Sequence, residues 1–181
     1  MHTVCISGSP REQSNTDYLL NLVLNGMDGE LIKLSDCRIE PCNSCWGCVK
    51  TRECTIKDDM TDTIIPKILK ADIIVLGSPV YFNNVSAQMK AFMDRTWAIR
   101  TKLRNKVGAA VVVGRRYGAE SAITAIHSFF LKHEMLVAQR GISGVAFDSH
   151  EIEQDEESIE VATMLSNRLT HLARAVNESE E

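Results

Sequence analysis

The sequence contains no run of about 18 apolar residues, which is the length that an α-helix needs to cross a bilayer. Its first residues, Met-His-Thr-Val-Cys-Ile-Ser-Gly, have neither the basic n-region nor the apolar h-region of a secretion signal. Lysine and arginine, 20 together, are outnumbered by 24 acidic residues, and the net charge of -4 forms no basic face for nucleic acid. We therefore expect a soluble, cytoplasmic protein without membrane or nucleic-acid partners.

Repeats, low-complexity segments and linkers are also absent from the 181 residues. The composition, 44% hydrophobic and 24% charged, is that of an ordinary globular protein. A chain of this length forms one domain with a sizeable core, so we expect a single domain over residues 1–181.

Short apolar runs alternate along the chain with amphipathic helical patterns. The predicted strands lie at 3–6, 30–34, 72–77, 107–113 and within 135–145, and the predicted helices at 16–27, 60–70, 85–100, 119–133 and beyond 158. The run Asp-Ile-Ile-Val-Leu-Gly at 72–77 is typical of a strand buried on both faces of a parallel sheet. This alternation predicts an α/β fold with a doubly wound, five-stranded parallel sheet in the order 2-1-3-4-5.

In such a sheet, ligands bind beyond the carboxyl ends of the strands, so the loops after strands one, three and four are the candidate site. The first of these loops, Ser-Gly-Ser-Pro-Arg-Glu-Gln-Ser-Asn-Thr at 7–16, opens a helix. Hydroxyls, backbone N–H groups and Arg11 converge there, as an anion site requires. The loop lacks the spacing of a Walker A or GxGxxG motif, so the phosphate monoester of a mononucleotide suits it better. The alternative is an ordinary turn in which Ser14 or Asn15 only caps the helix.

Four of the six cysteines fall within thirteen residues, with the spacing C-x2-C-x2-C-x5-C: Cys42, Cys45, Cys48 and Cys54. Cysteines so close together cannot join distant elements by disulfides, and they indicate a metal. A C-x2-C-x2-C run can surround one corner of a [4Fe-4S] cubane, whereas structural zinc more often uses two separated C-x2-C pairs. We favour the cluster, with zinc and free or redox-active thiols as alternatives. No role is assigned to Cys5 or Cys37.

Two segments, Gly-Ser-Pro-Arg-Glu-Gln-Ser-Asn-Thr at 8–16 and Gly-Ser-Pro-Val-Tyr-Phe-Asn-Asn-Val-Ser-Ala-Gln-Met-Lys-Ala-Phe-Met-Asp-Arg at 77–95, resemble the NADPH-dependent FMN reductase family. The resemblance spans most of residues 1–145, and the cysteine spacing matches the iron–sulfur flavoprotein branch of that family. It implies a flavodoxin-like fold, with the cysteine loop after the second strand, and two cofactors, FMN and a [4Fe-4S] cluster.

The resemblance also implies which residues bind FMN. The phosphate would contact the first loop, at Ser9, Arg11, Ser14, Asn15 and Thr16. The isoalloxazine ring would be flanked by the second loop, at Pro79, Val80, Tyr81, Phe82 and Asn84. A proline turn with two aromatic residues offers the flat apolar wall and the free amides that a flavin needs, although simple packing over the sheet edge would also explain the aromatics. In the loop after strand four, Gly114 and Gly118 would let the backbone approach the flavin edge, where this chain departs from relatives by placing Arg115, Arg116 and Tyr117.

The expected function is an oxidoreductase that passes electrons between cluster and FMN. Electrons would come from ferredoxin or NAD(P)H and reduce a small acceptor, which could be a quinone, O2 or peroxide, or a nitro compound. We predict no essential acid–base residue, and the resemblance implies a homodimer or homotetramer. The alternatives are an NAD(P)H-dependent FMN or quinone reductase without a cluster and a pure electron carrier.

Overall fold

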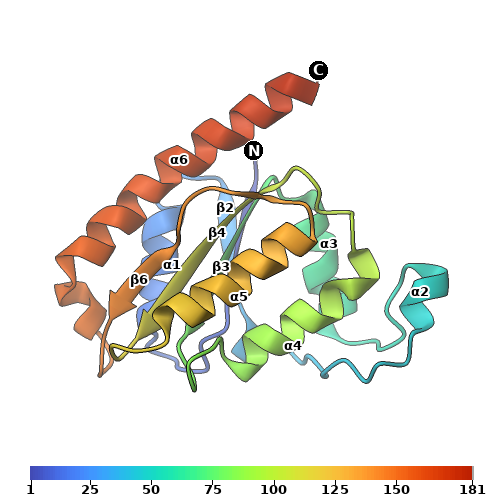
Figure 1. Cartoon of the computed structure of the whole chain (residues 1–181), viewed down its shortest axis with the longest axis horizontal. Coiled ribbons are helices and arrows are strands. Elements are labelled where there is room, and N and C mark those ends of the chain that lie inside the picture. The colour runs from blue at the N-terminus through green and yellow to red at the C-terminus, as the bar shows by residue number, and fades with distance from the viewer. Residues whose placement is uncertain (181) are drawn as a thin grey trace.

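Six parallel strands form one sheet in the computed structural model, which describes residues 1–180 (Figure 1). The strands are β1 (Thr3–Ser7), β2 (Gly29–Lys33), β3 (Ile73–Pro79), β4 (Val107–Gly114), β5 (Leu136–Val137) and β6 (Ile142–Val145). The α-helices are α1 (Asn15–Leu24), α2 (Gly47–Thr51), α3 (Ile65–Lys70), α4 (Ala87–Arg95), α5 (Ala119–Lys132) and α6 (Glu156–Glu180). Single 3-10 turns cover Leu34–Asp36, Thr96–Ile99 and Glu151–Gln154.

The strand order is β2-β1-β3-β4-β5, which confirms the predicted 2-1-3-4-5 arrangement. Strand β1 pairs in parallel with β2 on one side and with β3 on the other, so the chain reverses its direction of winding next to β1. The carboxyl ends of β1 and β3 therefore meet at a topological switch point, where open α/β sheets bind ligands.

The last predicted strand is divided in two. Strand β5 pairs with the beginning of β4, at Val107 and Gly108, and β6 pairs with its end, from Val111 to Gly114. Gly141 lies between them with φ of 103°, a conformation that only glycine adopts easily. The sheet thus has six strands rather than the predicted five, and β6 ends at the same edge as β1, β3 and β4.

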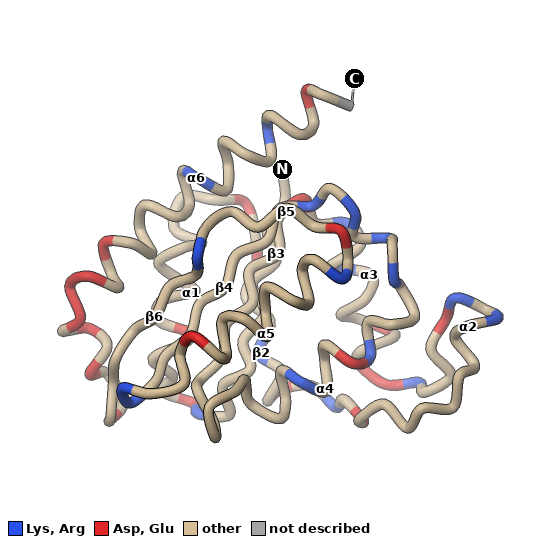
Figure 2. The backbone as a smooth tube through the Cα atoms, in the orientation of Figure 1, with Lys and Arg blue, Asp and Glu red and all other residues tan. Residues whose placement is uncertain are grey.

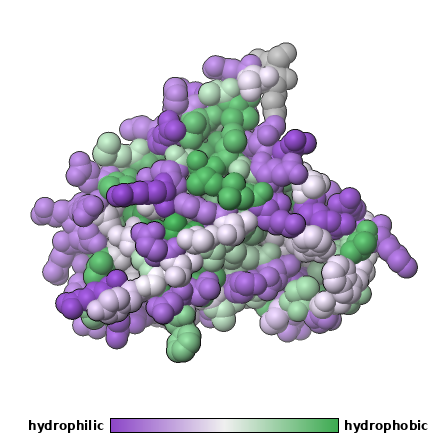
Figure 3. Space-filling view, in the orientation of Figure 1, coloured by the Kyte–Doolittle hydropathy of each residue, from purple (hydrophilic) through white to green (hydrophobic). Residues whose placement is uncertain are grey.

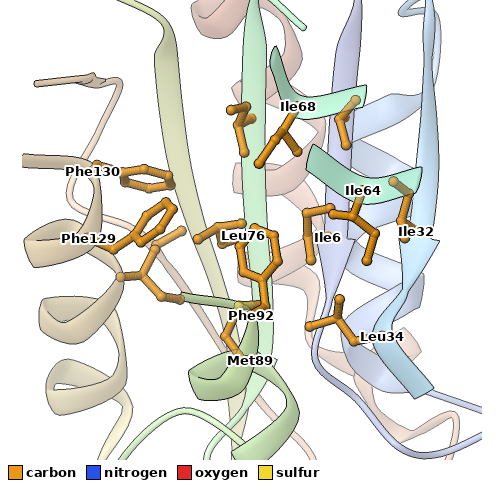
Figure 4. Close-up of a cluster of buried hydrophobic side chains, with 14 of the residues drawn as sticks. Ile6, Ile32, Leu34, Ile64, Ile68, Leu76, Met89, Phe92, Phe129 and Phe130 are labelled. Atoms are coloured by element: carbon orange, nitrogen blue, oxygen red, sulfur yellow. The ribbon is translucent and has the colours of Figure 1, made fainter. Parts of the chain in front are cut away.

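Helices cover both faces of the sheet (Figure 1). Alternate strand residues point to opposite faces, so that Ile6 and Leu76 pack under α3, α4 and α5, while Cys5 and Val75 pack under α1 and α6. Figure 4 shows the first of these cores, with aromatic rings from α4 and α5 against the aliphatic side chains of the strands.

Two helices differ from their predicted form. Residues 60–70 begin with a π-helical turn, Met60–Ile64, because Pro66 has no N–H for the regular i→i-4 hydrogen bond. The helix predicted at 85–100 begins at Ala87, where the Ser86 side chain accepts from the Met89 N–H at 3.2 Å, and continues after Arg95 as a 3-10 turn. Met89, on α4, is fully buried in the core (Figure 4).

The surface is mixed in polarity and uneven in charge. Apolar side chains gather beside the C-terminal half of α6 on the face shown in Figure 3. Acidic residues gather at the beginning of α6, whereas α2 carries basic ones (Figure 2). Within residues 1–180, every helix, including the 25-residue α6, lacks the apolar length that crossing a membrane requires.

Candidate functional site

A cavity of about 360 Å3 lies where the carboxyl ends of β1, β3, β4 and β6 meet. Its volume falls in the range of small-molecule sites, roughly 300–1,000 Å3. It is lined by Ser9, Arg11, Asn15, Thr16, Pro79, Val80, Tyr81, Phe82, Val113, Gly114, Arg115, Ala146 and Phe147. One end is therefore polar and the other apolar.

The polar end is formed by the loop that follows β1. Ser9 is a buried polar residue of the loop, and Asn15 and Thr16 are buried polar residues in the first turn of α1, where the N–H groups of a helix lack intrahelical partners. The Asn15 amide donates to the Asp148 carbonyl at 2.8 Å, while its Oδ1 is buried without a hydrogen-bond partner among residues 1–180. Donors at a helix N-terminus suit a phosphate, and the free Oδ1 can accept from a ligand hydroxyl.

Ser14 lies outside the lining of the cavity and caps α1 by accepting from the Asp17 N–H at 3.1 Å. Asp17 also accepts from the Ser7 hydroxyl and pairs with Lys33 at 2.9 Å. Lys33 Nζ donates in turn to the Arg11 carbonyl at 3.1 Å. Sequence reasoning missed these contacts of Lys33 with Asp17 and the Arg11 carbonyl, although the position of Lys33 at the end of β2 places it at the binding edge of the sheet.

The apolar end is formed by the loop after β3. The backbones of Tyr81 and Asn84 exchange hydrogen bonds of 2.9 and 3.0 Å, which closes a two-residue turn with Phe82 and Asn83 at φ of 50° and 61°. Phe82 is fully exposed, so its ring is not packed over the sheet edge, whereas Tyr81 is 44% exposed. Such left-handed conformations are rare for a bulky residue and concentrate at functional sites.

Of three residues beside this turn that were predicted to bind FMN, one lines the cavity and two lie outside its lining. Asn84 lies outside the lining and accepts the Val85 N–H on its own Oδ1 at 2.8 Å. Gly118 also lies outside, with φ of 82°, and a Cβ there would come within 2.6 Å of Asn83 Cα. Gly114 does line the cavity, and a Cβ on it would lie 3.0 Å from Val80. The two glycines thus allow the loop after β4 to approach the turn.

Ala146 and Phe147 line the cavity but were missing from the prediction, because the end of β6 was not counted among the binding loops. The Arg115 guanidinium donates to the Phe147 carbonyl at 3.2 Å and lies 5.8 Å from the centroid of the ring. The Glu151 carboxylate accepts from the N–H groups of Asp148 at 2.8 Å and Phe147 at 2.5 Å, and these bonds lower the pKa of Glu151.

The cysteine loop forms a second candidate site. All four of its cysteines are free and line one hollow of about 30 Å3, which Trp46, Arg95 and Trp97 also border. A hydrogen bond between Cys45 Sγ and the Thr55 hydroxyl, at 3.1 Å, is the main cause that lowers the pKa of the Cys45 thiol. This favours the thiolate, which is the form that binds metals.

The four thiols are not arranged around the position of a single metal ion. Within residues 1–180, no three Cys, His, Asp or Glu side chains are grouped as ligands of a metal ion. The ligands of a four-iron cluster each bind a different iron atom, so they stand further apart than the ligands of one ion. Four thiols around one hollow thus fit a cluster by donor chemistry, and the exposed loop must open to admit a group larger than about 30 Å3.

Helix α4 connects the two candidate sites. At its N-terminal end, the Ser86 hydroxyl donates to the Gly8 carbonyl in the first cavity loop at 2.7 Å. At its C-terminal end, Arg95 borders the cysteine hollow. The nine residues between these ends correspond to about 13 Å of helix. Figure 1 shows α4 between the loop after β3 and the cysteine loop.

Known proteins resemble this chain over most of its length. Residues 1–150 match the NADPH-dependent FMN reductase family. An iron–sulfur flavoprotein of Methanocaldococcus jannaschii is 40% identical over 194 residues, which cover 98% of this chain and 100% of that protein. An iron–sulfur flavoprotein of Archaeoglobus fulgidus is 32% identical over 203 residues, covering 100% of both chains.

Solved structures agree on the fold. RosB with a bound 8-demethyl-8-formylriboflavin-5'-phosphate intermediate superimposes with a TM-score of 0.82 at 17% identity, over 100% of this chain and 82% of that one. A flavodoxin from the domain Archaea gives a TM-score of 0.62 at 17% identity, over 94% of this chain and 100% of that one. The fold is therefore flavodoxin-like, as expected. The chain belongs to the NADPH-dependent FMN reductase family, in its iron–sulfur flavoprotein branch, and is an FMN-dependent oxidoreductase.

Proposed function

We propose that the cavity holds FMN with its phosphate at the beginning of α1 and its ring beside the turn at 81–84. The observation that carries this proposal is that nine of the twelve residues predicted to bind FMN line this one cavity. Its polar end offers buried donors and Arg11 to a phosphate. Its apolar end offers Val80 and the exposed rings of Tyr81 and Phe82 to a flat ring system.

The four thiols of the cysteine loop would hold a [4Fe-4S] cluster. When bound, FMN exchanges electrons singly or in pairs and a cluster exchanges them singly, so together they connect one-electron and two-electron partners. The protein's own part is to fix both sites on α4, to bind the phosphate and to present the aromatic turn at the mouth of the cavity. We assign no acid–base step to a side chain.

Charge near the cysteine loop supports a protein electron donor. Lys50 and Arg52 are exposed on and beside α2, next to one exposed acidic residue, Glu53. A basic rim of this kind steers an acidic carrier such as ferredoxin toward the loop. NAD(P)H is the alternative donor. A quinone, O2 or peroxide, or a nitro compound would be the acceptor at the flavin, in a cytoplasmic homodimer or homotetramer.

Two alternatives to an oxidoreductase with a cluster are a reductase without a cluster and a pure electron carrier. The small volume of the hollow, about 30 Å3, favours an NAD(P)H-dependent FMN or quinone reductase whose loop carries no cluster. A pure electron carrier would exchange electrons with ferredoxin but would not turn over small acceptors. Steady-state assays with NADH, NADPH and reduced ferredoxin against each acceptor class separate these three functions.

The FMN assignment is tested by fluorescence titration of flavin-free protein with FMN and with riboflavin, which lacks the phosphate. We expect FMN to bind at least tenfold more tightly, because charge-assisted hydrogen bonds to a phosphate contribute on the order of 1.5–3 kcal/mol each. Equal affinities would contradict a phosphate site at the beginning of α1.

A further inference from the structure

Arg95 is an arginine in the interior of the protein. Its side chain is 0% exposed, and it pairs with Asp58, whose side chain is 1% exposed. Nη1 donates to Asp58 Oδ2 at 2.7 Å and Nη2 donates to Asp58 Oδ1 at 2.9 Å, so the pair is bidentate. Burying two charges is costly unless they are fully satisfied, which suggests that this pair serves a purpose beyond stability.

The same pair closes the base of the cysteine loop. Arg95 Nη1 donates to the Glu40 carbonyl at 2.7 Å, and Nη2 donates to the Ile56 carbonyl at 3.1 Å. The Asp58 carboxylate also accepts from the Glu40 N–H at 2.9 Å. Glu40 precedes the first loop cysteine and Ile56 follows the last one, so one guanidinium ties together both ends of the loop.

Arg95 also faces the thiols. It borders the hollow that the four cysteines line, and its guanidinium lies within hydrogen-bonding reach of Cys54. Its Nε–H is buried without a partner among the described residues. An unpaired buried N–H on a side chain that borders the four thiols is a donor available to a thiolate or an inorganic sulfide.

We propose that Arg95, held in place by Asp58, is a positioning residue for the cysteine ligand set. This inference rests on the proposed cluster. Arg95 closes the loop at its base and places its guanidinium beside Cys54, and one N–H of that guanidinium is unpaired. Hydrogen bonds to the sulfurs help to set the reduction potential of a cluster. The arginine therefore stabilises the more reduced, more negative state.

The test uses a paired variant, because Arg95→Met alone would leave Asp58 buried and unpaired. Arg95→Met/Asp58→Asn removes both charges. Arg95→Lys keeps the positive charge but cannot make the bidentate pair with the Asp58 carboxylate. The matched control is Lys67→Met/Glu30→Gln. It removes an ion pair that lies outside the cysteine loop, in which Lys67 Nζ is 2.5 Å from Glu30 Oε2. Each protein is purified anaerobically, and FMN content and circular dichroism confirm that it is folded.

Two measurements then test the role of Arg95. We expect Arg95→Met/Asp58→Asn to lose at least half of the iron and sulfide per FMN, or to shift the midpoint potential of its cluster to a more negative value, with a smaller shift in Arg95→Lys. Unchanged cluster content and potential in both variants would overturn the proposal.

A second readout does not depend on the cluster. In metal-free protein, we expect limited proteolysis within 41–55 and alkylation of the loop thiols to be at least tenfold faster in the paired variant than in the control. Equal rates would contradict the proposal that Arg95 holds the two ends of the loop together. Wild-type protein without iron would contradict the proposed cluster, whereas these two rates would still test the closure of the loop by Arg95, so the two failures are distinguishable.

Discussion

The side-chain amide of Asn15 donates a hydrogen bond of 2.8 Å to the backbone carbonyl of Asp148, across 133 residues of chain. This bond joins the first cavity loop to the loop after β6 on the side of the sheet that α1 and α6 cover. Two segments that are remote in sequence thereby enclose the polar end of one cavity.

Loss of this bond should weaken FMN binding. Asn15→Ala removes one hydrogen bond and a buried acceptor, worth on the order of 1 kcal/mol, so we expect the Kd for FMN to rise about fivefold. Asn21→Ala, on the exposed face of the same helix, is the control. Flavin fluorescence titration measures both, and an Asn15→Ala Kd equal to that of the control would refute the role of this bond.

Gly118 should be intolerant of a side chain because of its neighbour rather than its backbone alone. Gly118 and Gly26 have similar φ values of 82° and 78°, but only at Gly118 would a Cβ meet backbone, 2.6 Å from Asn83 Cα. We expect Gly26→Ala to cost about 1 kcal/mol of unfolding free energy and Gly118→Ala to cost more, since strain of this kind ranges over roughly 1–3 kcal/mol.

Urea unfolding measures the two costs, and FMN titration provides the second readout. Displacement of Asn83 should also weaken FMN binding in Gly118→Ala but not in Gly26→Ala. Similar losses of stability in both variants, with similar FMN affinities, would show that the approach of the two loops has no bearing on the site.

The exposed Phe82 should contribute to ligand binding at the expense of stability. Phe82→Asn places at φ of 50° a residue that tolerates this conformation, so we expect unfolding free energy to stay equal or to rise by up to about 1 kcal/mol. FMN affinity or turnover should fall, because the ring at the mouth of the cavity is lost. If Phe82→Asn is less stable and binds FMN normally, the ring is a packing residue.

Stability should depend on pH through His133. This residue is buried, its Nε2 lies 2.9 Å from the Thr96 hydroxyl, and burial lowers its pKa to about 4. Between about pH 4 and the unfolded value of about 6.5, the unfolded chain binds a proton that the folded chain does not, so stability falls as the pH falls through this window. At pH 5 the loss relative to pH 7 should be on the order of 2 kcal/mol.

His133→Gln keeps an N–H donor for Thr96 and removes the titration, so its unfolding free energy should change less between pH 7 and 5 than that of the wild type. His150→Gln, at an exposed position, is the control. Identical pH dependences for wild type and His133→Gln in urea titrations would contradict a depressed pKa at His133.

The strand order and the edge of the sheet that carries the site followed from the sequence, because buried parallel strands such as Ile73–Pro79 have a continuous apolar pattern that few other structures share. The break at Gly141 did not follow, since a short apolar stretch with one glycine does not reveal where pairing stops. The loop after β6, with Phe147, was missed for the same reason.

The ion pairs of Lys33 with Asp17 and of Arg95 with Asp58 join residues that are far apart in the chain. At the beginning of the helix that follows, the Asp58 carboxylate accepts the Met60 N–H at 3.1 Å, a contact within a short window of sequence. Its main partner, however, is 37 residues away. Patterns within a short window cannot indicate such pairings.

The most direct test of the two-cofactor account is iron, sulfide and zinc analysis per FMN after anaerobic purification, with a visible spectrum, of wild type, Cys48→Ala and Cys37→Ala. Cys37, whose thiol donates to the Lys33 carbonyl at 3.4 Å, lies outside the four-thiol hollow and is the matched control. The account predicts about four iron and four sulfide per FMN in wild type and Cys37→Ala, and loss of the cluster with FMN retained in Cys48→Ala. Zinc, or no metal, with one FMN in the wild type would contradict it and leave a flavin reductase with a structural cysteine loop.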